Sequence, residues 1–420
     1  MRGPRIGSIL AEMVARQGET RRLAIASAMI VACSSNPGGS PDRDAAGGGR
    51  DATKVDSGSV HDARTADRMH GDTGTSVEAS TGDGGAPADA RDDADSAPPS
   101  GFVTASGTKL MLDGKVFQFI GFDAYGMTGC FNGTAWTVSQ LDAYFGGLPS
   151  NGMTRLWAFH RYGTAAIATI LTEAARYHQH VVLSIANDDG NCDPTTTDPN
   201  QTGEPLSFYQ SGWQGDYVAW VNTIVPMFKD NTTVAMWEIS NEPGQATSVP
   251  AATMDAYLAG AAAAIKAVDT NHLVESGIND VANVGNFQTA QSSPNIDVLS
   301  FHDYAWDYEN KAIESGNFTA AQAAAVALGK PFIAGEAGVE SGPTCTADLT
   351  QSQRVTYLQT KANDYFKGMA PNGTTGPAVA GIMFWEYEPV NTYGWTAGEC
   401  EYDFYAGDPL VGMVASYVIP

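Results

Sequence analysis

Phe, Tyr and Trp are absent from the first 101 residues of this 420-residue chain, and all eight Trp follow the first of these aromatic residues, Phe102. Between residues 34 and 100 the only large apolar residues are Val55, Val60, Met69 and Val77. Such a stretch buries too little apolar surface to offset the entropy lost on ordering, which excludes a folded domain there. We predict a disordered acidic tether, rich in Asp, Ala and Gly, over residues 34–100.

Basic residues are scarce, with 23 Lys and Arg against 47 Asp and Glu, so the formal net charge is −24. Most of this charge, −20, lies on residues 101–420. A surface this acidic repels nucleic acid and anionic lipid, which excludes both as partners. It is compatible with a neutral substrate such as a polysaccharide, although the solubility charge of a secreted protein explains it equally well.

The chain has no apolar run long enough to span a bilayer. The longest candidate, residues 23–32, follows Arg21 and Arg22 and has the length of a signal-peptide core. It ends in Ile-Val-Ala-Cys33, which resembles a bacterial lipobox. We predict that residues 1–33 are a lipoprotein-type signal, that Cys33 is lipidated, and that the protein is exported to the cell surface as an outer-membrane lipoprotein or to the medium. An ordinary cleaved signal peptide is the alternative.

Cysteine is also scarce. Of the five residues, lipidation of Cys33 leaves four for disulfides in an oxidising compartment. We expect Cys345 to pair with Cys400, because the loops after the last two barrel strands are neighbours, and Cys130 to pair with Cys192. None has a close Cys or His at ligand spacing, so no metal site is predicted.

Two common catalytic motifs are missing. No Gly-rich phosphate loop follows a predicted strand, so we predict no nucleotide or other cofactor. No Gly-x-Ser-x-Gly elbow is present either, which excludes an α/β hydrolase with a serine nucleophile.

From Phe102 onward, short apolar strands alternate with Ala-rich amphipathic helices, typical of a parallel α/β fold. We predict a single (β/α)8 TIM barrel over residues 101–420, preceded by a hairpin at 108–117 that turns at Asp113-Gly114 and plugs the barrel bottom. The helices expected most clearly are Ala165–Tyr177, Met254–Val268 and Gln351–Lys367. The predicted strands are Phe117–Phe122, Met153–Phe159, Val181–Ala186, Val234–Ser240, Leu273–Ser276, Asp297–Phe301, Pro331–Gly335 and Gly381–Trp385.

Two of these strands are closely followed by a glutamate, Glu242 and Glu336, at the barrel end where the chemistry of such folds takes place. A pair of carboxyl groups there is what glycosidic bond cleavage requires. Strand alternation predicts that Glu238, Ser240 and Glu242 share one face. Glu238, lying deeper, is predicted to be a buried structural carboxylate with Arg155 as its partner.

Five segments in order along the chain resemble strand-end motifs of glycoside hydrolase family 5, of clan A. They are Arg155–Phe159, the Trp-Glu-Ile-Ser-Asn-Glu-Pro stretch at 237–243, Phe301–Tyr304, Gly335–Gly338 and Phe384–Glu386. The resemblance is greatest to the endo-β-1,4-mannanases and covers nearly the whole predicted barrel. It implies a retaining mechanism, with Glu242 as acid/base and Glu336 as nucleophile.

The resemblance also implies supporting roles. Arg155 and Tyr304 would keep the nucleophile ionised, and Asn241 would bond the sugar 2-hydroxyl. His302 would orient the acid/base or contact substrate, and Trp385 would form a platform for a sugar ring.

Further site residues are predicted from their loop positions. Tyr125, Trp306 and Trp395 are expected to line distal subsites, and Asn187 to reach the cleft. Other loop aromatics are candidates for the same role, namely Trp136, Trp213, Tyr308 and Tyr393. Three carboxylates are expected at the surface or the substrate rim, namely Glu340, Glu386 and Glu388.

The sequence therefore predicts a monomeric retaining glycoside hydrolase that cleaves within a β-1,4-linked polysaccharide, mannan first. The loop at 187–192 departs from the mannanase pattern, so a cellulase or an exo-β-glycosidase is the alternative with the same chemistry. A non-catalytic glycan-binding lipoprotein is the alternative of another class; the presence of both glutamates with Arg155, Asn241 and Tyr304 argues against it.

Overall fold

The computed structural model describes residues 101–130, 133–149, 152–187, 192, 203–245, 247–280, 284–304, 316–342, 349–370, 373, 375–389 and 402–420. The predictions for the signal, the tether and several single residues lie outside these ranges. Those residues are Cys33, Trp306, Tyr308, Cys345, Tyr393, Trp395 and Cys400.

Eight parallel strands form the barrel, in the order β8-β7-β6-β5-β4-β11-β10-β9. A parallel bridge links Glu275 of β8 to Val298, the residue before β9, so the two ends of that order meet, which confirms the predicted TIM barrel. The first barrel strand begins at Phe119, two residues later than predicted. The strands are β4 (Phe119–Asp123), β5 (Met153–Trp157), β6 (His180–Ser184), β7 (Val234–Glu238), β8 (Leu273–Glu275), β9 (Leu299–Asp303), β10 (Phe332–Ala337) and β11 (Gly381–Phe384).

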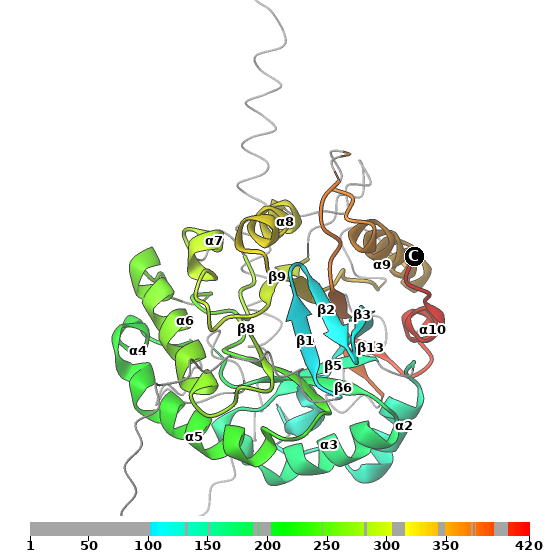
Figure 1. The fold of residues 1–420 in the computed structure, drawn as a ribbon. Coiled ribbons are helices and arrows are strands. Elements are labelled where there is room, and N and C mark those ends of the chain that lie inside the picture. Colours follow the sequence, from blue (N-terminus) through cyan, green and yellow to red (C-terminus); the bar gives the residue numbers. More distant parts are fainter. Residues whose placement is uncertain are drawn as a thin grey trace, which may run out of the picture. The chain divides into compact units, whose positions relative to one another are not determined.

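Helices surround this barrel as an outer ring (Figure 1). In α6, the buried residues Met254, Leu258, Ala261 and Ile265 recur at helical spacing, so one face packs on the strands. No helix in the described ranges is long and apolar enough to cross a membrane. The helices are α2 (Val138–Gly146), α3 (Ala165–Arg176), α4 (Leu206–Gln210), α5 (Asp216–Phe228), α6 (Ala251–Lys266), α7 (Phe287–Ala290), α8 (Gly316–Leu328), α9 (Gln351–Phe366) and α10 (Pro409–Ser416), with short 3-10 turns η1 (Tyr125–Thr128), η2 (His160–Tyr162) and η3 (Gly212–Gln214).

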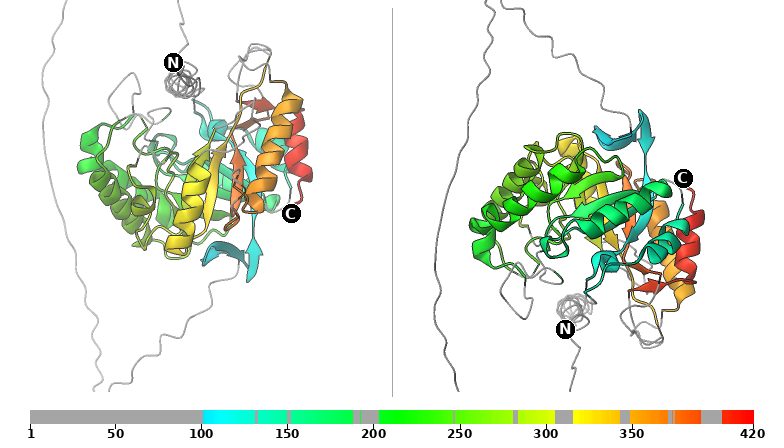
Figure 2. Two further views of the ribbon diagram at one scale, coloured as in Figure 1. Left: turned by 90° about the horizontal axis from the view of Figure 1, so that it is seen from above. Right: turned by 90° about the horizontal axis from the view of Figure 1, so that it is seen from below.

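A small antiparallel sheet of β1 (Val103–Ser106), β2 (Lys109–Leu112) and β3 (Lys115–Phe117) projects from one end of the barrel (Figure 2). Its β2–β3 turn has positive φ at both Asp113 and Gly114, 49° and 74°, as a two-residue hairpin turn requires. Leu110 and Phe117 pack with Met153 and Met236 of the barrel strands. The predicted hairpin plug is confirmed.

A buried ion pair anchors the C-terminal helix. Arg354 of α9 lies 2.6 Å from an Asp408 carboxylate oxygen, and both side chains are 2% exposed. The other Asp408 oxygen accepts the Leu410 N–H and caps α10. The Arg354 guanidinium also donates to the carbonyls of Tyr402 and Asp403.

We expect Asp408→Asn to lower the free energy of unfolding by about 3–5 kcal/mol, because it keeps an N-cap but removes the carboxylate charge that faces a buried guanidinium. Denaturant unfolding measures this. Lys229→Ala, which removes a half-exposed partner of Asp230, is the control and should change stability by less than about 1 kcal/mol. Equal effects of the two variants would contradict the prediction.

Candidate active site

The predicted catalytic residues meet at the carboxyl end of the barrel. Arg155 lies in β5, His302 in β9 and Glu336 in β10, while Asn241 and Glu242 follow the end of β7. Parallel strands in a barrel all end at the same rim, so residues far apart in sequence converge there. All five side chains are buried or nearly so.

Arg155 is the centre of the hydrogen-bond network. Its guanidinium donates to Glu336 Oε1 at 2.6 Å, to Asn241 Oδ1 at 2.6 Å and to Glu238 Oε1 at 2.8 Å. It also donates to Asp123 Oδ1 at 3.0 Å. Arg155 therefore neutralises Glu238, as predicted, and also binds Glu336 at the strand tip. The two roles predicted for Arg155, partner of Glu238 and partner of Glu336, are compatible.

Glu336 is held as an anion. Tyr304 donates its hydroxyl to Oε2 at 2.5 Å, and His302 Nδ1 lies 3.3 Å from the same oxygen. Burial alone would raise the pKa of Glu336, but His302 and Arg155 lower it to about 2. The register of β10 against β9 shifts at Gly335, where a Cβ would lie only 3.1 Å from His302 Nε2, so a glycine here leaves room for the histidine ring.

The pKa of Glu242 is shifted in the opposite direction, upward. Burial raises its pKa, the charge of Glu336 raises it further, and the hydrogen bond from His302 opposes both. His302 Nδ1 lies 2.8 Å from Glu242 Oε1. The Glu242 backbone has φ of 49°, in the left-handed region, and its N–H donates to the Gly277 carbonyl at 3.0 Å. Two neighbouring carboxyl groups are thus shifted apart in pKa.

The prediction that Glu238, Ser240 and Glu242 share one face of the strand is wrong. Strand β7 ends at Glu238, and Ser240 then bonds Tyr257 of the surrounding helix α6 at 3.1 Å. Asn241 instead turns inward with Glu238, since both accept from Arg155. The strict two-residue period applies only to extended backbone, which has ended before Glu242.

One donor atom each of Glu242, His302 and Glu336 lie within 4.8 Å of one another. These are also residue types that bind metals. However, Glu336 Oε1 already accepts from Arg155, and Oε2 from Tyr304. Both Glu336 oxygens and His302 Nδ1 are therefore engaged in a hydrogen-bonded pair of carboxyl groups bridged by a histidine. Burial would lower the pKa of His302, but the two glutamates outweigh it and raise this pKa to about 10.

An aromatic cluster borders this pair. The half-buried Trp385 stacks on Tyr125, with ring centres 5.0 Å apart and planes 2° from parallel, and lies 6.0 Å from Trp157. Tyr125 itself is 6% exposed, so it supports Trp385 from behind. The Cys130–Cys192 disulfide joins the same cluster, which confirms that predicted pairing.

Asn187 is 1% exposed and accepts a hydrogen bond from Asn241 Nδ2 at 2.9 Å. It therefore orients Asn241 beside the carboxyl pair. Asp123, which accepts a hydrogen bond from Arg155, is a site residue that was not predicted from the sequence; its position at the end of the first barrel strand is the signal that marks it.

Several predictions about loop residues are wrong. Glu386 and Glu388 are fully buried, not at a rim, because the chain after Trp385 turns inward and β12 (Tyr387–Glu388) pairs with β13 (Phe404–Tyr405). Burial raises the pKa of Glu386 well above its usual value, and Asp403 and Glu388 add to the shift. Trp136 and Trp213 pack in the helix layer, against Tyr144 and Tyr257. Glu340 is half-buried.

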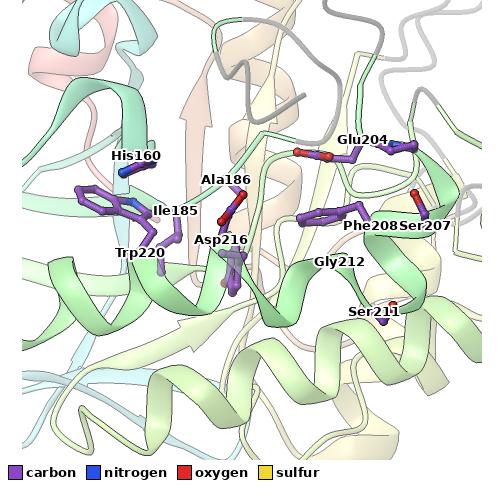
Figure 3. Close-up of a pocket in the computed structure, with 12 residues that line it drawn as sticks. His160, Ile185, Ala186, Glu204, Ser207, Phe208, Ser211, Gly212, Asp216 and Trp220 are labelled. Carbon is purple, nitrogen blue, oxygen red and sulfur yellow. The ribbon is translucent and has the colours of Figure 1, made fainter. Parts of the chain in front are cut away.

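A hollow of about 390 Å³ lies beside Ile185 and Ala186, the two residues that follow β6 (Figure 3). Trp220 and His160 form part of its wall, and Glu204 and Asp216 supply carboxyl groups. Its wall includes Ala186, whose carbonyl accepts the Asn241 N–H. Its lining includes none of the predicted catalytic residues.

Comparisons with known proteins agree with this geometry. A family model described as Cellulase (glycosyl hydrolase family 5) matches residues 155–368. The chain is 23% identical over 296 residues to mannan endo-1,4-beta-mannosidase 8 of Oryza sativa subsp. japonica, covering 56% of this chain and 79% of the relative. It is 27% identical over 324 residues to a probable mannan endo-1,4-beta-mannosidase C of Aspergillus terreus, covering 63% and 77%.

The fold is similar to that of the endo-1,4-beta-mannanase from Rhizomucor miehei, with a TM-score of 0.56 and 20% identity over 75% of this chain and 97% of that one. The family match spans half of the chain and includes four of the five strand-end motifs. This chain therefore belongs to glycosyl hydrolase family 5 and is a glycoside hydrolase.

Proposed function

We propose that this protein is a retaining endo-β-1,4-mannanase in which Glu336 is the nucleophile and Glu242 the acid/base. The observation that carries the proposal is the spacing of the two carboxyl groups, with an oxygen of each within 4.8 Å. Retaining enzymes need a separation of about 5–5.5 Å, whereas inverting enzymes leave about 6.5–9.5 Å for a water.

The reaction follows from the charge states. Ionised Glu336 attacks the anomeric carbon while Glu242 gives its proton to the departing glycosidic oxygen, which forms a glycosyl ester. Glu242 then takes a proton from a water that cleaves this ester, which restores both groups. Because its pKa is about 10, His302 stays protonated, and its Nδ1–H donates a hydrogen bond to Glu242 Oε1. The other oxygen, Oε2, is therefore the one that carries the transferred proton.

Two neighbouring groups complete the sugar-binding site. Asn241 uses Oδ1 toward Arg155 and one Nδ2 hydrogen toward Asn187, which leaves its second Nδ2 hydrogen for a sugar 2-hydroxyl. The half-exposed Trp385, fixed by stacking on Tyr125, offers its ring to the apolar face of a sugar.

The choice of mannan rests on the relatives, which carry that activity in their names. Reducing-sugar release from galactomannan, glucomannan, carboxymethyl cellulose and xylan tests it. We expect galactomannan and glucomannan to be cleaved with an early fall in viscosity, which marks cleavage within the chain. Reducing-sugar release from carboxymethyl cellulose alone would show that the protein is a cellulase. Reducing-sugar release from mannan without a fall in viscosity would show that it is an exo-enzyme. Binding without any release would favour the glycan-binding alternative.

The pH profile should be bell-shaped. Activity needs ionised Glu336, whose pKa is about 2, and protonated Glu242, whose pKa is raised. Activity is therefore lost on the alkaline side as Glu242 ionises. Because the charge of Glu336 helps to raise the pKa of Glu242, Glu336→Gln should lower that pKa. Titration of the Glu242 carboxyl by carbon NMR in both proteins measures the shift, and an unchanged or raised pKa would contradict it.

We also propose that the protein is exported as a lipoprotein anchored through Cys33, with residues 34–100 as spacer. In a bacterial host, Cys33→Ala should move the protein from the membrane fraction to the soluble fraction. Membrane association that survives the substitution would disprove the anchor.

A further inference from the structure

We propose that Glu275, a residue outside the catalytic pair, is a buried neutral carboxylic acid that donates a hydrogen bond to Glu238 and positions both catalytic glutamates. This inference rests on the proposed roles of Glu242 and Glu336. Glu275 is fully buried and ends strand β8, directly opposite Glu238 in the β7–β8 register.

The first contact leads to the acid/base. Glu275 Oε2 accepts the Gly277 N–H at 2.6 Å, and the Gly277 carbonyl accepts the Glu242 N–H at 3.0 Å. Gly277 has φ of 72°, and a Cβ there would lie 1.8 Å from the Ser240 carbonyl oxygen. Glu275 thus holds a glycine turn that touches the end of β7 and supports Glu242 in its left-handed backbone conformation.

The second contact leads to the nucleophile. Glu238 binds Arg155 through both carboxylate oxygens, and Arg155 binds Glu336 Oε1 at 2.6 Å. Within the described part of the chain, Glu275 Oε1 has no hydrogen-bond donor. Burial raises the pKa of Glu275, and the charge of Glu238 and a side-chain hydrogen bond with it raise this pKa further. Two facing carboxylates would repel each other, whereas a proton on Glu275 makes this contact a hydrogen bond to Glu238 and gives the unpartnered Oε1 a partner.

The charge of the barrel interior supports this assignment. The network around Arg155 and His302 contains five buried acids and two buried bases, namely Asp123, Glu238, Glu242, Glu275, Glu336, Arg155 and His302. If all five acids were ionised, this network would carry three uncompensated negative charges, which burial strongly disfavours. Burial raises the pKa of Asp123, Glu242 and Glu275, and protonating these three makes the group neutral.

A matched pair of variants tests the positioning role. Gln at position 275 can still accept from Gly277 and donate to Glu238, whereas Leu can do neither. We expect Glu275→Gln to keep kcat within about fivefold and the pH profile unchanged, and Glu275→Leu to lower kcat about 10²-fold with a smaller change in KM. If Gln were as damaging as Leu, Glu275 would be needed as an anion and the proposal would be overturned.

The protonation state can be measured without relying on activity. In the infrared difference between wild type and Glu275→Gln at neutral pH, we expect loss of a protonated-carboxyl C=O band with the ionised carboxylate bands unchanged. Loss of a carboxylate band instead overturns the proposal, even if Glu275→Leu does not fold. Activity surviving in Glu336→Gln would refute the proposed mechanism but leave this spectrum unaffected, so the two failures are distinguishable.

Discussion

Glu336→Gln is expected to lower kcat/KM on mannan by at least about 10⁴-fold, because an amide cannot form the glycosyl ester. The substitution keeps the shape of the side chain. Its amide oxygen can still accept from Arg155, which donates to Glu336 Oε1 in the wild type. The loss should therefore be chemical and not structural, and circular dichroism with the unfolding midpoint checks this.

The control removes one carboxylate charge far from the chemistry. Asp230 follows α5, and its side chain is 74% exposed. Asp230→Asn should leave kcat/KM within about twofold. Substantial mannan hydrolysis by Glu336→Gln, with the fold intact, would end the assignment of Glu336 as nucleophile.

Glu242→Ala is expected to lower kcat on mannan by about 10²–10⁴-fold, the contribution of general acid–base catalysis. The loss should depend on the leaving group. An aryl mannoside whose phenol is acidic needs no proton from Glu242 to depart, so its first step should survive. The ester with Glu336 should then accumulate, because no base activates water, and appear as a burst of phenol.

Added azide separates the two glutamates. In Glu242→Ala it attacks the Glu336 ester without a general base and should restore turnover of the aryl mannoside, giving a β-mannosyl azide of retained configuration. In Glu336→Gly it attacks the substrate directly and should give the inverted α-azide. The opposite assignment of products would exchange the roles of the two residues.

Much of this site was predictable because local patterns mark strand ends. The Asn-Glu-Pro that follows β7 and the Glu in β10 each come at the end of a short apolar strand, and in a parallel barrel such ends meet. The hairpin turn at Asp113-Gly114 was predictable for a similar reason, since these two residues tolerate the positive φ of a tight turn.

Other features depend on contacts that no local pattern encodes. Glu386 and Glu388 look like loop carboxylates in sequence, yet both are fully buried, because β12 pairs with a strand formed near the end of the described chain. Trp136 and Trp213 resemble sugar platforms until their partners in the helix layer are known. Each outcome depends on which distant segment covers the side chain.

The sequence by itself determined the barrel, the two glutamates and the family resemblance, because periodicity and strand-end chemistry are local properties. Only the tertiary structure decided that Arg155 serves Glu238 and Glu336 together, that His302 bridges both catalytic candidates, and that Glu275 faces Glu238. These contacts join residues that are far apart along the chain. They follow from barrel register and from the break in extended backbone after β7, which are set by packing of the whole domain.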